Sequence, residues 1–373
     1  MANSNDVLLA TRLNDWIVES AGLYKNEFRK GMYGALNFFL NQTSAPDSVV
    51  SDEAIAVAHN SNGRTIKIPV LKHSNAQSGT TRSCDIPNNE VKSAMQTVTF
   101  SSWVDGFYMF PQRYTNNIVG YRRHFAANML AMLLRFWKWA DGKCLLNLEA
   151  NKNTVWTDVN LMNSTQSGNV IQFSHRDRYD MMGDLTGIMH SAGWGGVMNL
   201  IGNSGIANVF LKLYEYGKFN ETDLTYEYSD KRFWETSNLQ NGSGKYATTF
   251  IVPNGQVGML SRVSRAEYAA ARGPVSEWGT TLLPGCGDLL FGTHFKKIEG
   301  DMAALMNGTG TFTDAESSVN DMKCDMAECY GFAIDIAFVN AYNSQAGSVA
   351  EPVMKAEVAR GTNAVDVNVL NNE

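Results

Sequence analysis

An arm of two strands joined by a polar span decides the fold. It lies in residues 60–104, NSNGRTIKIPVLKHSNAQSGTTRSCDIPNNEVKSAMQTVTFSSWV. Ile66 and Ile68 alternate with polar neighbours near one end, and Val98 and Phe100 do the same near the other. This period of two predicts strands, while the span between them offers almost nothing to bury. Because an isolated two-stranded ribbon is marginally stable in water, we expect something outside the arm to hold it.

The composition indicates a packed globular protein. The chain has 373 residues, of which 44% are hydrophobic and 11% aromatic. This length exceeds the usual size of one compact core, so we expect about two domains, or one core with long excursions. The net charge of −6 and the pI of about 5.6 argue against a protein that binds nucleic acid mainly by neutralising phosphates, because such domains are usually basic.

Cysteines and apolar runs bear on the compartment. The five cysteines are odd in number and lack CxxC spacing, which argues against a disulfide scaffold and a structural zinc site. The N-terminus shows no basic segment followed by an apolar one, so no secretory signal is predicted. The most apolar run, FAANMLAMLL, is too short to span a bilayer. We therefore expect a soluble protein in a cytoplasm-like compartment, without membrane contact.

Helical periods dominate the first half outside the arm. Two amphipathic helices are predicted within the first 45 residues, the second ending before Pro46. A third pattern runs from about residue 113 to 150 and includes Phe125, Met132 and Phe136. If it is continuous, this helix is roughly 50 Å long, whereas a break at Gly142 is the alternative.

Shorter elements follow from about residue 175. RDRYDMMGDLTGIMHSAG predicts a helix with Met182, Leu185 and Met189 facing inward, and VMNLI predicts a short buried strand. Ser204 is predicted to cap the next helix. YATTFIV, PNG and QVGMLSRV together have the turn chemistry of a hairpin.

Two further elements are predicted toward the C-terminus. The capping-box spacing in SRAEYAAARG predicts a helix that stops at Gly273. ECYGFAIDIAFVNAY alternates regularly and predicts a long strand with one bulky face packed on helices. That face is formed by Tyr330, Phe332, Ile334, Ile336 and Phe338.

A search for catalytic motifs finds none. The six histidines form no HExxH pattern, and NGSGK, residues 241–245, lacks both the upstream glycine and the Ser or Thr of a phosphate loop. Cys286 has no neighbouring histidine to activate it, so we interpret it as a small residue in a tight loop. The acidic segment TDAESSVNDMKCDMAE lacks EF-hand spacing. The sequence thus predicts no catalytic, cofactor-binding or metal site, and no enzyme.

The order of these elements resembles the major capsid proteins of tailed double-stranded DNA bacteriophages, which have the Hong Kong 97-type fold. GRTIKIPVLKHSNAQSGTTRSCDIPNNEVKSAMQTVTFSSWV is similar to the extended loop of that family, and TNNIVGYRRHFAANMLAMLLRFWKWAD to its spine helix. VMNLIGNSGIANVFLKL and YATTFIVPNGQVGMLSR resemble its axial domain, and ECYGFAIDIAFVNAY the long strand of its peripheral domain.

The resemblance implies an α+β fold with a set order of parts. These are an N-terminal helical arm at 1–59, an extended β-hairpin loop at 60–104, a peripheral domain with the spine helix at 105–170, an axial domain at 171–310, and the return strand with a C-terminal tail at 311–373.

The resemblance also implies a function. The chain would assemble with itself into hexamers and pentamers of an icosahedral shell around packaged double-stranded DNA, which it would contact weakly. Separate scaffolding, portal and decoration proteins are the other implied partners. The expected location is the virion, assembled in the cytoplasm of the host cell.

The arm is predicted to lie across a neighbouring subunit and to contact it through Ile66, Ile68, Val98 and Phe100. Two alternatives stay open at this point. One is a cytoplasmic α+β enzyme with residues 60–104 as a lid, which would need convergent polar groups beneath it. The other is an encapsulin, a shell of the same fold that holds protein cargo.

Overall fold

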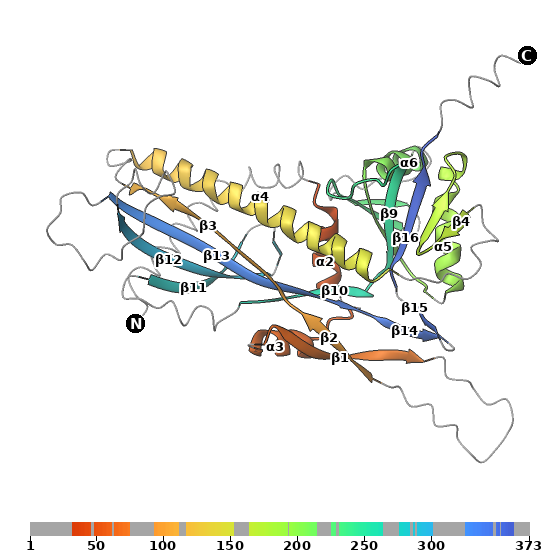
Figure 1. The fold of residues 1–373 in the computed structure, drawn as a ribbon, viewed down its shortest axis with the longest axis horizontal. Coiled ribbons are helices and arrows are strands. Elements are labelled where there is room, and N and C mark those ends of the chain that lie inside the picture. The colour runs from red at the N-terminus through yellow and green to blue at the C-terminus, as the bar shows by residue number, and fades with distance from the viewer. Residues whose placement is uncertain are drawn as a thin grey trace, which may run out of the picture.

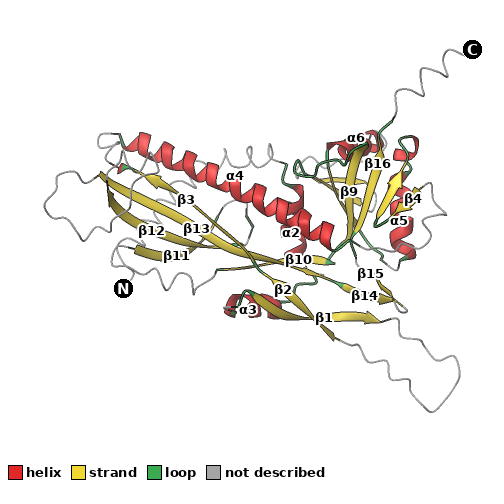
Figure 2. Cartoon of the chain, viewed as in Figure 1, coloured by secondary structure: helices red, strands yellow, loops and turns green. Residues whose placement is uncertain are grey.

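The structure is a computed structural model of the whole chain. It describes residues 32–45, 48–61, 63–74, 93–111, 117–152, 164–192, 194–214, 225–228, 231–263, 276–283, 286–287, 289–300, 325–345, 348–350 and 352–361. The described strands form three sheets, and helices lie beside and between them (Figures 1 and 2). The first predicted helix and the helix predicted at SRAEYAAARG lie outside the described residues.

Helix α4, Ile118–Ala150, runs unbroken for 33 residues. Its N-cap is Asn117, whose side chain accepts a hydrogen bond from the main-chain nitrogen of Gly120 at 2.8 Å. Gly142 does not interrupt it, so the prediction of one continuous helix is confirmed and the alternative of a break is wrong. The hydrogen-bonded ladder and the packing on both sides of this residue outweigh the modest cost of one glycine.

A five-stranded sheet lies along α4 (Figure 1). Its strands are β3 (Ser101–Met109), β10 (Val257–Arg262), β11 (Ser276–Leu282), β12 (Leu290–Gly300) and β13 (Asp325–Asn340). The 16-residue β13 is central, since it pairs antiparallel with β3, β10 and β12. The long strand predicted near the C-terminus is thus the central strand of this sheet.

The largest core fills the space between this sheet and α4. Tyr330 and Phe332 of β13 stack on Phe107 of β3, and Tyr330 also meets Phe125 of α4 edge-on at 5.0 Å between ring centroids. All four belong to one buried cluster. The predicted bulky face of the strand is therefore confirmed, and it packs on the helix as its alternation requires.

A seven-stranded sheet stands at the C-terminal end of α4. Its order is β4-β5-β16-β9-β6-β8-β7. The bounds are β4 (Ser164–Ser167), β5 (Val170–Phe173), β6 (Met198–Gly202), β7 (Thr225–Tyr228), β8 (Lys231–Glu235), β9 (Lys245–Pro253) and β16 (Met354–Ala359).

Three helical segments accompany this sheet, namely η3 (Arg176–Arg178), α5 (Met181–Ser191) and α6 (Ser204–Tyr214). The inward side chains predicted for α5, Met182, Leu185 and Met189, are buried in the second core cluster. Strand β6 is buried throughout, as predicted from VMNLI. The cap of α6 is Asn203 and not Ser204, because Asn203 Oδ1 accepts from the main-chain nitrogen of Gly205 at 3.2 Å.

The arm belongs to a four-stranded sheet of order β15-β14-β1-β2. Its strands are β1 (Thr65–Ser74), β2 (Ser93–Thr99), β14 (Tyr342–Gln345) and β15 (Ser348–Ala350), and helix α3 (Asp52–Asn60) lies beside β1. Helix α2 (Gly34–Thr43), the second predicted N-terminal helix, lies between the five- and seven-stranded sheets and contacts strands of both.

The structure corrects the predicted hairpin at YATTFIV-PNG-QVGMLSRV. Strand β9 enters the seven-stranded sheet, whereas β10 pairs with β13 of the five-stranded sheet. The turn chemistry is present, with Gly255 at φ +74°, but the chain uses it to pass from one sheet to the other. Strand β10 finds a longer partner in the 16-residue β13 than β9 would be, and β9 is paired on both sides, with β16 and β6.

The sheets also group the chain differently from the predicted boundaries. Strands β10, β11 and β12 lie within 171–310, which was assigned to the axial domain, yet they pair in the sheet with β13. Strand β16 lies within 311–373, yet it pairs with β5 and β9 of the seven-stranded sheet. The chain thus crosses between the two sheets more than once, and the predicted domain boundaries stay a prediction. No helix among the described residues is long and apolar enough to cross a membrane.

Candidate assembly site

The four predicted contact residues of the arm are buried within this chain. Ile68 is 2% exposed, Val98 and Phe100 are 3% exposed, and Ile66 is 6% exposed. They form the third core cluster together with residues of α3, β10, β13 and the segment before α3, namely Val50, Ala54, Ala58, Leu260, Ala337 and Val339. The base of the arm is therefore held by its own chain.

The subunit contact assigned to Ile66, Ile68, Val98 and Phe100 stays a prediction, and within this chain the four side chains already have apolar partners. Their alternation signals burial, and α3 with β10 and β13 supplies the apolar surface that buries them. A contact that leaves these side chains in place would use other atoms of the arm.

The edge of β2 offers such atoms. The main-chain nitrogen of Phe100 donates to the carbonyl of Arg64 at 2.9 Å, and the register pairs Ile68 with Gln96. Hydrogen-bonded pairs alternate in an antiparallel ladder, so the amide and carbonyl of Thr97 point away from β1. Among the described strands β2 pairs only with β1. No other described strand therefore pairs with the outward groups of β2, a feature that the sequence reasoning missed.

Arg262 fastens the base of the arm to the five-stranded sheet. Its guanidinium pairs with Asp335 of β13 at 3.2 Å and lies 4.0 Å from the centre of the Phe100 ring. It also donates to the carbonyls of Ser61 at 2.9 Å and Gly63 at 2.6 Å. This buried guanidinium, with one contact to Asp335 and two to main-chain carbonyls, holds the turn between α3 and β1 in place.

Asp141 joins three parts of the chain from inside α4. One carboxylate oxygen accepts from the main-chain nitrogen of Leu36 in α2 at 3.0 Å. The other accepts from Thr236 Oγ1 at 2.7 Å and from Asn238 Nδ2 at 2.8 Å, both just beyond β8. The carboxylate therefore caps α2 from another helix, since the N-cap residue Tyr33 supplies no side-chain bond.

Burial disfavours the charged form of the Asp141 carboxyl. The residue is fully buried, and burial raises the pKa of its carboxyl, although the hydrogen bonds from Thr236, Leu36, Asn238 and the main chain lower it in part. The helical period could have flagged this residue, because it lies on the buried side of α4 beside Ala140 and Cys144. Its partners, about a hundred residues away, could not be read from the sequence.

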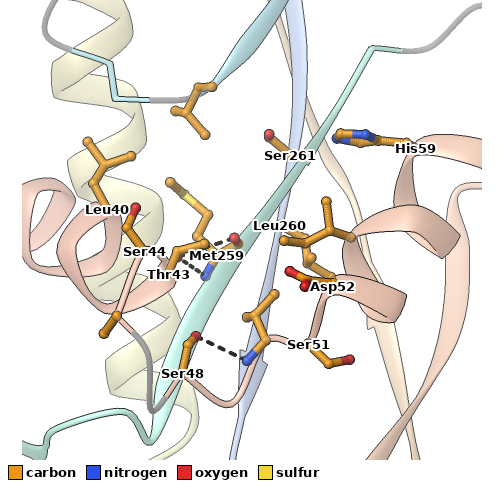
Figure 3. A pocket seen from close by; sticks show the side chains of 14 residues that line it. Leu40, Thr43, Ser44, Ser48, Ser51, Asp52, His59, Met259, Leu260 and Ser261 are labelled. Atoms are coloured by element: carbon orange, nitrogen blue, oxygen red, sulfur yellow. Dashed lines mark hydrogen bonds between the residues drawn. The ribbon is translucent and has the colours of Figure 1, made fainter.

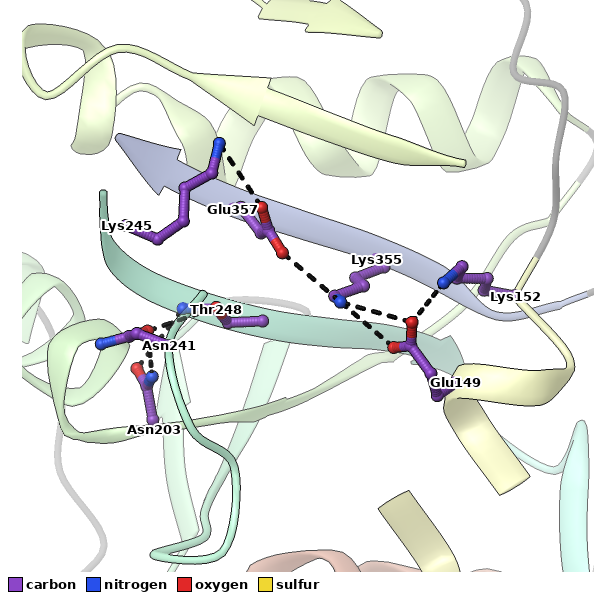
Figure 4. A network of polar contacts seen from close by, with 8 residues as sticks. All are labelled: Glu149, Lys152, Asn203, Asn241, Lys245, Thr248, Lys355 and Glu357. Carbon is purple, nitrogen blue, oxygen red and sulfur yellow. Dashed lines mark hydrogen bonds and ion pairs between the residues drawn. The ribbon is translucent and has the colours of Figure 1, made fainter. Parts of the chain in front are cut away.

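An ionic chain connects the end of α4 to the seven-stranded sheet (Figure 4). Glu149 of α4 pairs with Lys152 and, at 3.1 Å, with Lys355 of β16. Lys355 pairs with Glu357 at 3.4 Å, and Glu357 with Lys245 of β9 at 3.5 Å. The charges alternate along the chain, so each inner member has two partners. Burial raises the pKa of Glu149, but the two lysines more than offset this, and the pKa lies below its usual value.

An open cavity of about 740 Å³ lies between α2, α3 and β10 (Figure 3). Leu40 and Met259 line it on one side, and Ser51, Asp52 and His59 on the other. Within the part of the chain that the structure describes, no three His, Cys, Asp or Glu side chains are grouped as metal ligands.

The cysteine that the sequence singled out lies in the interior. Cys286 is fully buried, its sulfur accepts from Trp137 Nε1 at 3.3 Å, and burial raises its pKa to about 12. It has the character of a packed, protonated thiol, whereas the sequence predicted only a small residue in a tight loop. NGSGK is likewise a turn that leads into β9. The acidic segment, including Asp314, lies outside the described residues.

Comparisons with known proteins find likenesses among solved structures. No family model matches the chain, and no curated protein matches its sequence. The capsid structure of the cyanophage P-SCSP1u is 9% identical, with 82% of this chain and 86% of that chain covered and a TM-score of 0.43. The capsid of Ralstonia phage GP4 is 7% identical, with 86% and 92% covered and a TM-score of 0.44. A structure from Mycobacterium phage Bobi is 13% identical, with 82% and 90% covered and a TM-score of 0.39.

Proposed function

We propose that this chain is the major capsid protein of a tailed bacteriophage, with the Hong Kong 97-type architecture. The observation that carries the proposal is the arrangement around α4. One unbroken helix lies along a sheet built on β13, an arm leaves that body, and a second sheet stands at the end of the helix. This is the order of parts that the sequence resemblance implies.

Assembly of many copies is the proposed activity. Hexamers and pentamers of the chain would tile an icosahedral shell around double-stranded DNA in the virion, with assembly in the host cytoplasm and with separate scaffolding, portal and decoration proteins as partners. Ring contacts of this kind are heterologous and close only when the rotation between subunits suits five or six copies.

The outward edge of β2 is the part of the arm that we propose for the subunit contact. A strand from a neighbouring copy could add to the outward amide and carbonyl of Thr97 by main-chain hydrogen bonds. In this arrangement the buried side chains of the arm hold its base. The strand of the neighbouring copy pairs with the edge of β2, with which no other described strand of the same chain pairs.

The test is electron microscopy of the expressed protein in negative stain, alone and with other virion components. Closed shells or rings of five or six subunits are expected. Small uniform particles under every assembly condition would contradict the proposal. Shells that hold cargo protein and exclude nucleic acid would favour the encapsulin alternative.

A further inference from the structure

Helix α4 has a basic outer face in an acidic protein. Its lysines and arginines are Arg122, Arg123, Arg135, Lys138 and Lys143. Its only acids are Asp141 and Glu149. Asp141 is buried and accepts hydrogen bonds from four donors, and Glu149 forms ion pairs with two lysines at the junction with the seven-stranded sheet. The positive charge of the helix is therefore not cancelled by its own carboxylates.

The face is exposed from Arg123 to Lys138. Arg123, Arg135 and Lys138 are exposed, and so are the small residues Ala127 and Ala131 between them. The opposite side of the helix is buried in the largest core cluster. One neighbouring carboxylate, Asp105 of β3, pairs with Arg135, whose side chain is still 53% exposed. The core thus fixes which side of α4 is outward.

The dimensions suit a linear polyanion. A helix of 33 residues is about 50 Å long. The exposed basic residues from Arg123 to Lys138 span about 22 Å of it. Duplex DNA presents a charge every ~1.7 Å along its axis, so this stretch would lie beside several phosphates. The small side chains at Ala127 and Ala131 would allow a backbone to approach the helix closely between the two groups of charges.

We propose that the exposed face of α4 binds the phosphate backbone of duplex DNA and faces the inside of the shell. This rests on the proposed capsid function. The contact is sequence-independent and weak, because a handful of basic side chains act within a chain whose net charge is −6.

The test measures binding of fluorescent duplex DNA to the dissolved protein over a range of salt concentrations. The variant R123Q/K138Q removes two exposed charges from the face. The control R64Q/K67Q removes two exposed charges at the base of the arm. For R123Q/K138Q we expect weaker binding and a log–log salt slope that is shallower by about 1.8, since each lost phosphate contact accounts for ~0.9. The control should match the parent.

Three results would overturn the inference. The parent could fail to bind duplex DNA at low salt, the control could lose as much affinity as R123Q/K138Q, or polyglutamate could bind more tightly than DNA, which would assign the face to an acidic protein.

Assembled shells test the direction of the face and separate the two proposals. Closed shells formed without DNA should bind added duplex less than dissolved subunits do, and equal binding would place the face outside. If the parent forms no shells, the capsid function fails, while DNA binding by α4 is still measured on the dissolved chain. If shells form and the α4 variant binds DNA like the parent, only the inference about α4 fails.

Discussion

The main-chain nitrogen of Leu36 donates to Oδ1 of Asp141 at 3.0 Å across 105 residues of sequence. The same carboxylate holds Thr236 and Asn238 beyond β8. One side chain of α4 therefore sets the position of α2 and of the second sheet at the same point.

Removing this acceptor should destabilise the protein. Asp141→Ala leaves buried donors without partners, and we expect the free energy of unfolding to fall by about 2 to 4 kcal/mol. Asp141→Asn keeps the shape and one acceptor oxygen, but its amide NH2 faces the donors on the other side, so its loss should be smaller, about 1 to 2 kcal/mol. Urea denaturation of the soluble variants measures both. A loss for Asp141→Asn as large as that of Asp141→Ala would contradict a stabilising role for the acceptor oxygen that Asn retains.

The raised pKa of Asp141 predicts a pH dependence of known sign. A carboxyl whose folded pKa lies above its unfolded value adds stability at low pH, and this contribution is lost as pH rises through the folded pKa. The parent should therefore gain stability relative to Asp141→Asn as pH is lowered toward the ordinary value of 3.8. A difference between the two that does not change with pH would contradict the raised pKa.

Glu149 should behave in the opposite way. Its folded pKa is lowered, so its contribution is present above the ordinary value of 4.5 and is lost as pH falls through the folded pKa. We expect Glu149→Gln to cost about 0.5 kcal/mol at neutral pH, a value discounted for a side chain that is 41% exposed. That cost should shrink in acid and in high salt. The change Leu146→Gln, at a position of α4 that is 62% exposed and outside the ionic chain, serves as a control for helix effects.

Two glycines in helices should respond to alanine with opposite signs. A Cβ at Gly142 meets nothing within 4 Å, so Gly142→Ala should stabilise α4 by roughly 0.5 to 1 kcal/mol through helix propensity. A Cβ at Gly34 would lie 2.3 Å from the carbonyl oxygen of Glu235, so Gly34→Ala should destabilise the junction of α2 with β8. Thermal unfolding of the two variants decides this. A gain in stability at Gly34 would mean that this close approach is not real.

The parts that could be predicted from the sequence are those with a strong local period. The 3.6-residue period gave α4 its bounds to within a turn or so, and the alternation around Phe332 identified β13 and its buried face. The turn before Gln256 was read correctly as a turn, but which sheet each flanking strand joins depends on partners far along the chain. The same holds for Asp141, because its donors are contributed by remote segments.

The arm shows this limit most clearly. Alternation predicted that Ile68 and Phe100 are buried, and they are. It could not say whether the covering surface belongs to the same chain or to another, since both satisfy one pattern. The structure assigns the cover to Ala337, Val339 and α3 of the same chain.

This cover changes what an aspartate in the arm should do. Ile68→Asp places a carboxylate among apolar side chains of the same chain, so the chain itself should lose about 3 to 5 kcal/mol of stability. Met95→Asp is the matched control, because Met95 lies in the paired strand but is 59% exposed, and its change should stay within about 0.5 kcal/mol. A stable Ile68→Asp chain that merely fails to assemble would instead support the predicted subunit contact at Ile68.

The outward edge of β2 has its own test in two prolines placed one residue apart. Thr97→Pro removes an amide that points away from β1, so the chain should keep most of its stability while shell formation is impaired if a neighbouring strand pairs there. Gln96→Pro removes an amide that points toward Ile68 and should unfold the base of the arm. Denaturation measures the stability of both variants. Counting closed shells by electron microscopy measures shell formation by Thr97→Pro. If Thr97→Pro assembles as well as the parent, β2 is not the edge through which subunits pair.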